Sequence, residues 1–231
     1  MDDALLALLR SVDTPTVCNA IETAQGQRGF SAFTRRTVMS SAPEAGAIVG
    51  FARTARIAAR FPSSDPADEV RARRLGYYRH MSEGARPAIA VIEDIDYPNA
   101  VGAYWGEVNT TVHKALGLSG AVTNGVMRDL GDLPDGFPVI AGSIGPSHAF
   151  VHVVDYAAGA RVFDLDVAEG DLIHADRHGA LVIPTDVIAD LAAAIETLFR
   201  AERCILDPAR KGPMSFAEFE TAWADFERAR T

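Results

Sequence analysis

The residues whose types and spacing could do chemistry lie in one stretch near the middle of the chain, which holds two glycine turns. The first turn is Gly106, Glu107 and Val108, ahead of an expected helix, and the second ends in adjacent Arg128 and Asp129. Backbone N–H groups at a helix N-terminus have no partner within the helix, so they bind carboxylates or phosphates. Arginine holds a planar carboxylate through two parallel hydrogen bonds, and an ionised aspartate is a hard oxygen ligand for Mg²⁺ or Mn²⁺. The stretch therefore predicts an anion site next to a divalent metal.

An exposed ion pair beside a turn is the competing interpretation of Arg128 and Asp129. Such a pair is worth only about 0–1 kcal/mol and occurs on many surfaces without a function. One carboxylate also makes a sparse metal site. Mg²⁺ commonly keeps several waters and takes further ligands from a substrate, however, so a single protein carboxylate is physically reasonable.

Two histidine pairs have the spacing of metal ligands on a helix, His148 with His152 and His174 with His178. Both pairs fall in segments expected to be strands, where residues four apart are separated by about 13 Å. That distance is too long for two direct ligands of one ion, so we do not predict a histidine zinc site. His178 with the glycine that follows it is better explained as a turn.

Periodic and continuous apolar runs predict the elements that must position these residues. Proline at the expected first turns and glycines around the helix that follows Gly106 support the helix limits. Helices are expected at 3–10, 14–24, 65–81, 107–116, 186–203 and 215–228. Strands are expected at 46–59, 87–92, 120–123, 138–141, 150–156, 160–165, 171–175 and 180–183.

The order of these elements predicts the architecture. The helix at 107–116 lies between two strands of a β-α-β unit, and the turn-like residues 157–159 would join the strands on either side of them into an antiparallel hairpin. This mixture of units favours a three-layer α/β sandwich over a regular doubly wound fold. We expect one domain over residues 1–231, with a helical N-terminal segment 1–25 and C-terminal helices within 186–231.

Composition narrows the function classes. The formal net charge of −9 argues against a broad nucleic-acid surface, because phosphate binding depends on clustered Lys and Arg. The two cysteines, Cys18 and Cys204, have no disulfide or CxxC spacing, which favours a reducing compartment, and we expect the cytoplasm. The acidic N-terminus does not fit a signal peptide, and no stretch approaches the roughly 20 apolar residues of a membrane span. Six arginines are expected on a solvated or inter-subunit surface rather than in a polyanion patch: Arg53, Arg56, Arg60, Arg71, Arg73 and Arg74.

The segment WGEVNTTVHKALGLSGAVTNGVMRD resembles the signature of the RraA-like family, whose members have a WGE or GGD turn and, further along, a DGxxRD turn. Two flanking segments, DTPTVCNAIE and EGDLIHADRHGALVIP, resemble the family's N-terminal helix start and its late PGDxxxxDxxGxxxxP segment, and GFARTA resembles a strand between them. The resemblance runs in order from Thr14 to Pro184. One departure is Asn124, which stands where the family has the Asp of its DG turn.

The resemblance implies an activity and roles for the residues of both turns. In the aldolase branch of the family, Asp129 would hold Mg²⁺ or Mn²⁺, Arg128 would bind the substrate, and the amides of Gly106, Glu107 and Val108 would hold the carboxylate of pyruvate. The Glu107 side chain would help to place a water or the reacting oxygen. The fold implied is a β/β/α sandwich of the swivelling-domain type with mixed sheets and flanking terminal helices.

The implied reaction is metal-dependent cleavage of a 4-hydroxy-2-oxo acid to pyruvate and a second oxo acid. Substrates would be acids such as 4-hydroxy-4-methyl-2-oxoglutarate or 4-carboxy-4-hydroxy-2-oxoadipate, with oxaloacetate decarboxylation as a side activity. The family also implies a homotrimer or hexamer, in which Glu202 is the candidate carboxylate reaching a neighbouring subunit's site; a solvated glutamate is the alternative. A non-catalytic regulator of an RNA-degrading endonuclease is the alternative function. A methyltransferase is disfavoured, because no GxGxxG motif follows an expected strand.

Overall fold

The computed structural model describes residues 2–230, and the chain forms two compact units. The strand-containing unit consists of Leu9–Thr14 and Ala32–Ile183, and the helical unit consists of the residues up to Leu8, Pro15–Ser31 and the chain from Pro184 onward. Across residues 2–230, no helix combines the length and the apolarity needed to cross a membrane.

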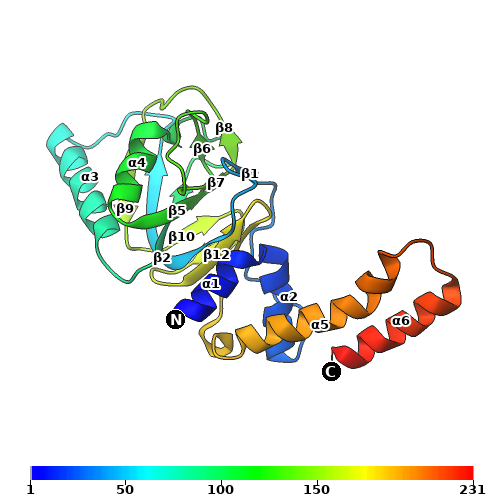
Figure 1. The fold of residues 1–231 in the computed structure, drawn as a ribbon. Helices are drawn as coiled ribbons and strands as arrows, with labels where there is room; N and C mark the ends of the chain where they lie inside the picture. The colour runs from blue at the N-terminus through cyan, green and yellow to red at the C-terminus, as the bar shows by residue number, and fades with distance from the viewer. Residues whose placement is uncertain (1, 231) are drawn as a thin grey trace. The chain divides into compact units, whose positions relative to one another are not determined.

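One mixed sheet of eight strands organises the strand-containing unit (Figure 1). Its order is β1 (Met39–Ser40), β7 (Val139–Ala141), β5 (Leu118–Thr123), β3 (Ala88–Asp94), β2 (Ile48–Ala58), β12 (Leu172–Asp176) and β13 (Gly179–Ile183), with β9 (His152–Tyr156) also on β2. The four strands from β7 to β2 are parallel, and β1, β9, β12 and β13 pair antiparallel. The central strand β3 is buried along almost its whole length, as expected for a parallel strand covered on both faces.

Two smaller sheets complete the unit. A parallel three-stranded sheet contains β4 (Ala103–Trp105), β6 (Val126–Met127) and β8 (Ser143–Ile144), and a hairpin contains β10 (Ala160–Val162) and β11 (Leu165–Val167). The hairpin predicted across residues 157–159 is therefore wrong, because β9 pairs with β2 and β10 pairs with β11. The true turn lies at Phe163 and Asp164, whose φ angles of 49° and 66° are both positive, as a tight two-residue hairpin requires.

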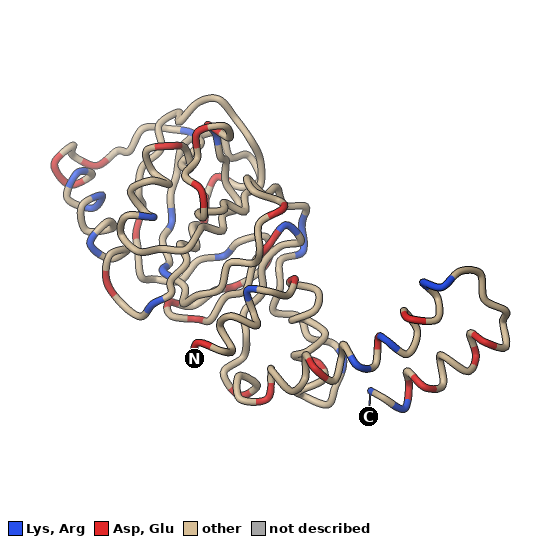
Figure 2. The backbone as a smooth tube through the Cα atoms, in the orientation of Figure 1, with Lys and Arg blue, Asp and Glu red and all other residues tan. Residues whose placement is uncertain are grey.

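The helices match the predicted positions closely, with one correction (Figure 1). They are α1 (Asp3–Ser11), α2 (Thr14–Gln25), α3 (Ala67–Ser82), α4 (Glu107–Ala115), a 3₁₀ turn η1 (Thr185–Val187), α5 (Leu191–Ala209) and α6 (Phe216–Ala229). Helix α5 starts later than predicted and continues through Pro208, which lies in its last turn. Figure 2 shows the charged residues along the backbone, with several basic positions on α3.

The main sheet packs on both faces, which produces the layers. Along β3, Ile89 and Val91 belong to one apolar cluster, while Ala90 and Ile92 belong to another, because successive side chains of a strand point to opposite faces. The first cluster includes residues of the β10–β11 hairpin, and the second includes α3 and the three-stranded sheet. The predicted α/β fold, a three-layer β/β/α sandwich with mixed sheets, is confirmed.

Candidate functional site

The two glycine turns of the sequence lie next to each other because the strands that lead into them are neighbours. Strand β4 ends at Trp105 and passes into the first turn, and β6 ends at Met127 and passes into the second. The strands are parallel with Trp105 opposite Met127, and the N–H of Arg128 donates to the carbonyl of Trp105 at 2.8 Å. Parallel strands bring their carboxyl ends to one edge, where α/β folds bind ligands.

The side chain of Asp129 accepts a hydrogen bond from the N-terminus of α4. Its φ of 56° is in the left-handed region, which aspartate adopts more readily than most residues. This backbone turn directs the carboxylate back towards the helix, where Oδ2 accepts the backbone N–H of Glu107 at 3.1 Å. A negative charge is favourable there because the first turn of a helix carries partial positive charge. One of the three amides predicted to hold a substrate carboxylate is therefore engaged by Asp129 in this structure.

Gly106 allows the two turns to approach so closely. Its backbone is extended, so the need for glycine comes from space rather than from φ. A Cβ at this position would lie 2.5 Å from Oδ2 of Asp129 and 3.0 Å from Nε of Arg128. Any side chain would therefore displace the carboxylate or the guanidinium.

Arg128 has an unused hydrogen-bond donor. Its Nη1 lies 3.4 Å from both carboxylate oxygens of Asp129, which is a long and weak contact. Its Nε is buried and donates to no acceptor among the described residues. A buried donor without an acceptor costs free energy, so Arg128 is a candidate to bind an acceptor from outside the chain. A carboxylate that takes Nε and one Nη together is the geometric match.

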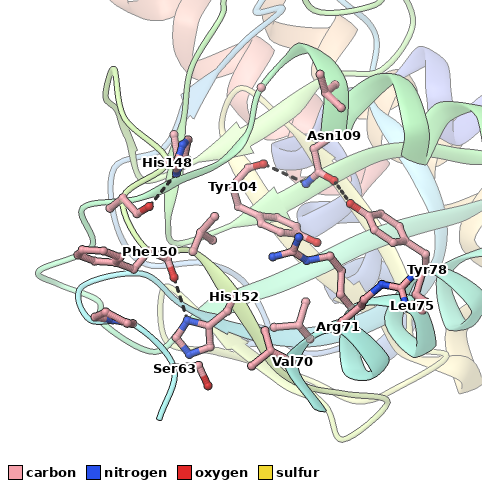
Figure 3. Close-up of a pocket in the computed structure, with 18 of the residues that line it drawn as sticks. Ser63, Val70, Arg71, Leu75, Tyr78, Tyr104, Asn109, His148, Phe150 and His152 are labelled. Carbon is pink, nitrogen blue, oxygen red and sulfur yellow. Dashed lines mark hydrogen bonds between the residues drawn. The ribbon is translucent and has the colours of Figure 1, made fainter. Parts of the chain in front are cut away.

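A pocket of about 960 Å³ opens on this edge of the sheet (Figure 3). Gly106, Val108, Asn109 and Arg128 line it on the side of the two turns. Asp129 does not line this pocket but contacts Arg128, which does. Its other walls come from the segment before α3, one face of α3, strand β4 and the segment 148–153: Pro62, Ser63, Asp65, Ala67, Val70, Arg71, Arg74, Leu75, Tyr78, Ala103, Tyr104, His148, Ala149, Phe150, Val151, His152 and Val153.

Helix α4 is held in place by a network that the sequence did not suggest. The side-chain amide of Asn109 donates to the carbonyl of Tyr104 at 2.9 Å, and the hydroxyl of Tyr78 donates to Oδ1 of Asn109 at 3.0 Å. Figure 3 shows both bonds. The hydroxyl of Thr110 donates to the carbonyl of Gly106 at 2.9 Å. The N-terminus of α4, which carries the candidate amides, is therefore fixed to β4 and α3.

His113 forms the buried end of this network. Burial lowers the pKa of His113 to about 4, so the ring is neutral at physiological pH. Its Nδ1 lies 2.6 Å from the carbonyl oxygen of Asn109 and therefore carries the proton, which leaves Nε2 to accept the hydroxyl of Tyr77 at 2.5 Å. The Asn-x₃-His spacing on an expected helix, which places both side chains on one face, is the sequence signal that could have indicated this pair.

Asn124, the departure from the family motif, joins the ends of two central strands. Its Oδ1 accepts the N–H of Asp94 at 2.7 Å, and its Nδ2 donates to the carbonyl of Asp94 at 3.2 Å. An aspartate could not make the second bond, because an ionised carboxylate has no donor. Burial raises the pKa of Asp94 to about 6, and its Oδ2 has no hydrogen-bond partner among the described residues. A second carboxylate at position 124 would add repulsion here.

The remaining predicted residues have other surroundings. His148 and His152 line the pocket, but each Nδ1 contacts a nearby backbone carbonyl, at 2.7 Å and 2.9 Å. The His178 turn is confirmed between β12 and β13. Glu202 is half-buried on α5 in the helical unit, and its role at a neighbouring subunit stays a prediction.

The metal-ligating side chains around Asp129 determine which metal ion this site could bind. Within residues 2–230, no three His, Cys, Asp or Glu side chains group closely enough to enclose an ion. The Asp129 carboxylate is partly exposed, and among the described residues its Oδ1 makes only the long contact with Arg128. Since Mg²⁺ and Mn²⁺ accept one protein carboxylate when waters and substrate oxygens complete the shell, these residues fit such an ion, with Oδ1 as ligand.

Comparisons with known proteins identify relatives of this fold. The profile of the RraA-like family, described as Aldolase/RraA, matches residues 14–182. An uncharacterized protein from Pseudomonas syringae pv. tomato has a TM-score of 0.70 at 18% identity, over 100% of this chain and 94% of that chain. RraAS2 of Streptomyces coelicolor, an unusual member of the RNase ES inhibitor RraA protein family, has a TM-score of 0.63 at 20% identity, over 88% of this chain and 94% of that chain. A Geobacillus kaustophilus protein named S-adenosylmethionine:2-dimethylmenaquinone methyltransferase has a TM-score of 0.51 at 15% identity, over 68% of this chain and 89% of that chain.

A search of curated proteins found no match to the chain. The identities to the solved structures are low, so these structures establish the fold alone. The match to the family profile is evidence for family membership, because it spans most of the chain and includes both glycine turns and the pocket.

Proposed function

The chain belongs to the RraA-like family, and we propose that it is a divalent-metal-dependent carbon–carbon lyase that cleaves a 4-hydroxy-2-oxo acid to pyruvate and a second oxo acid. The observation that carries this proposal is Arg128, which lines the pocket beside the N-terminus of α4 and has a buried Nε with no acceptor among residues 2–230. Both features attract a carboxylate, and every substrate of this class carries one next to its 2-oxo group.

The bond that breaks lies between C3 and C4 of the substrate. The 4-hydroxyl gives up its proton, C4 becomes a carbonyl carbon, and the electron pair of the broken bond moves into an enolate over C3, C2 and the 2-oxo oxygen. Protonation of C3 then gives pyruvate. A bound Mg²⁺ or Mn²⁺ supplies Lewis-acid stabilisation of the negative charge on that oxygen.

The chain's own residues bind and orient the substrate. Arg128 holds the C1 carboxylate through its fork, and the amide of Val108, in the first turn of α4, has no acceptor within the helix and adds a donor. Asp129 would hold the metal through Oδ1, since its Oδ2 accepts the amide of Glu107. The exposed carboxylate of Glu107, which lies in the same turn but does not line the pocket, is the group that we assign to proton transfer from the 4-hydroxyl.

An enolate can also be stabilised by a lysine Schiff base, and the positions of the lysines disfavour that route. The chain has only Lys114 and Lys211. Neither lines the pocket, and Nζ of Lys114 donates to the carbonyl of Asp135 at 2.6 Å. The same enolate forms when oxaloacetate loses CO₂, so we propose oxaloacetate decarboxylation as a side activity.

The proposal includes an oligomer. We propose a homotrimer, or a hexamer of two trimers, in which Glu202 contributes a carboxylate to the site of a neighbouring subunit. The sparse set of carboxylates around Asp129 supports a contribution from outside the protomer.

Pyruvate release tests the function directly. The purified chain is incubated with Mg²⁺ or Mn²⁺ and with 4-hydroxy-4-methyl-2-oxoglutarate, 4-carboxy-4-hydroxy-2-oxoadipate or oxaloacetate, and pyruvate is measured with lactate dehydrogenase. We expect release that depends on the metal and stops with a chelator. A reaction with metal alone corrects for spontaneous loss of CO₂ from oxaloacetate. Absence of pyruvate from all three substrates would refute the lyase. Slowing of an RNA-degrading endonuclease by the same preparation would then favour the regulator.

A further inference from the structure

One face of α3 forms a wall of the pocket. This helix is distant in sequence from both glycine turns. Val70, Arg71, Arg74, Leu75 and Tyr78 line the pocket, and their spacing of three and four residues is that of a single helix face. Figure 3 shows Leu75 and Tyr78 on one side of the pocket and His148 and Phe150 on the other. This face of α3 therefore meets whatever part of a ligand extends away from Arg128.

The two arginines on this face have no acidic partner among the residues that the structure describes. Arg71 and Arg74 are exposed and form no ion pair within residues 2–230. Arg73, between them in sequence, is paired with Asp65 at 2.8 Å. Asp65 is also the only acidic residue among those that line the pocket. The positive charge of Arg71 and Arg74 is therefore left uncompensated at the pocket wall.

The pocket is larger than the pyruvate half of a substrate requires. Its volume of about 960 Å³ is near the upper end of the range for small-molecule sites, which is about 300–1,000 Å³. A pyruvate unit held by Arg128 and the amides of α4 would occupy one end. The rest of the pocket, including the α3 wall, is left for the fragment that departs with C4.

We propose that Arg71 and Arg74 form a second anion subsite, which selects substrates whose departing fragment carries a carboxylate. This inference rests on the proposed function, since it assumes that the 2-oxo acid end binds at Arg128. Two guanidinium groups one helical turn apart can share one carboxylate, and each adds charge-assisted hydrogen bonds. Holding the far end fixes the C3–C4 bond relative to the catalytic groups, so this remote contact also serves orientation.

The apolar side chains of the same wall offer a competing specificity. Leu75 and Phe150 are largely exposed in the pocket and would suit an uncharged tail instead. The two possibilities differ in one measurable quantity, which is the preference for a ligand with a distal carboxylate over a ligand of equal length without one.

Two five-carbon ligands make this comparison without any cleavage. 2-Oxoglutarate and 2-oxopentanoate share the 2-oxo acid end, lack the 4-hydroxyl, and differ in the distal carboxylate alone. Calorimetric titration with Mg²⁺ present should show that the wild type binds 2-oxoglutarate at least 10-fold more tightly. The double variant Arg71→Gln with Arg74→Gln should lose most of this preference while its Kd for 2-oxopentanoate stays within about twofold. Arg79→Gln, which changes an exposed arginine of α3 outside the pocket, is the matched control and should keep the preference.

Each outcome decides a separate claim. A wild type that binds both ligands equally, or a double variant that keeps the full preference, would overturn the anion subsite and leave the proposed function standing. A wild type that binds neither ligand would refute the 2-oxo acid site at Arg128 and the subsite with it. A preference for 2-oxopentanoate would assign the wall to an apolar tail. Circular dichroism of every variant shows whether the substitutions leave the fold intact.

Discussion

Replacing Asp129 by asparagine separates the metal-site interpretation from the ion-pair interpretation. The two carboxylate oxygens have different surroundings: Oδ2 accepts the amide of Glu107 at 3.1 Å, while Oδ1 has, within residues 2–230, only the 3.4 Å contact with Arg128. An asparagine oxygen can keep the amide bond, because it is also an acceptor. Its NH₂ group would then stand where Oδ1 stood, and an NH₂ group cannot bind a cation. The variant should fold and lose its metal.

The expected stability loss is small. Removing the charge at the N-terminus of α4 costs about 0.3–1 kcal/mol, and removing a partly exposed ion pair costs about 0–1 kcal/mol. A loss of about 1 kcal/mol lowers the melting temperature of a chain this size by about 2–4 °C. Turnover should fall at least about 100-fold, which corresponds to roughly 2.7 kcal/mol in the barrier, because the ion that stabilises the enolate is no longer held.

Three measurements on one preparation test this reasoning: the melting temperature, Mn²⁺ binding by calorimetry and metal-dependent pyruvate release. Asp132→Asn is the matched control, since Asp132 is an exposed acid three residues away, and it should behave as the wild type. A folded Asp129→Asn variant with full Mn²⁺ affinity and turnover would refute the assignment of Asp129 as a ligand and leave the surface ion pair as the explanation.

Four further predictions follow from the same geometry. Arg128→Lys keeps the charge but loses the fork, so kcat/KM should fall about 10- to 100-fold; unchanged kinetics would reduce Arg128 to an ion-pair partner. Gly106→Ala places a Cβ 2.5 Å from Oδ2 of Asp129 and should weaken Mn²⁺ binding at least 10-fold in calorimetry, whereas wild-type affinity would show that the turn yields easily. The raised pKa of Asp94, about 6, means that its stabilising contribution is present below its ordinary pKa near 4 and is lost as the pH rises through 6. Asp94→Asn should therefore be about 1–3 kcal/mol more stable than the wild type at pH 8, with a smaller gain at pH 5 in urea titrations; an equal gain at both pH values would contradict this. Light scattering should give the mass of a trimer or hexamer, and a fully active monomer would exclude the subunit-bridging role of Glu202.

The sequence predicted elements better than it predicted their partners. Apolar runs located the parallel strands and the helix of the β-α-β unit, because burial on both faces leaves a continuous pattern. The hairpin was assigned to residues 157–159, because an Ala-Ala-Gly turn is a familiar signal, while Phe163 and Asp164 adopt positive φ without any glycine. Strands β4, β6 and β8 were missed because two or three residues are too short to show a period.

The candidate site was predictable where it depends on local motifs and not where it depends on packing. Glycine turns at strand ends indicated Gly106 and Arg128, but their contact depends on the pairing of β4 with β6, which is long-range. The hydrogen bond from Glu107 to Asp129 was not expected, so the amides had all been assigned to a ligand. Arg71 was expected on a solvated or inter-subunit surface, because only the tertiary position of α3 shows that it lines a pocket.

The net charge of the chain and the arginines of the pocket act on a ligand over different distances. Together they indicate which kind of ligand we expect the pocket to bind. A chain with a formal charge of −9 repels large polyanions, because many phosphates interact with the whole surface at once. The arginines of the pocket act at contact, and salt screens exposed charges beyond about 8–10 Å, so a small anion that enters the pocket meets mainly Arg71, Arg74 and Arg128. We therefore expect the acidic surface to disfavour a nucleic acid, but not a di- or tricarboxylate that enters the pocket.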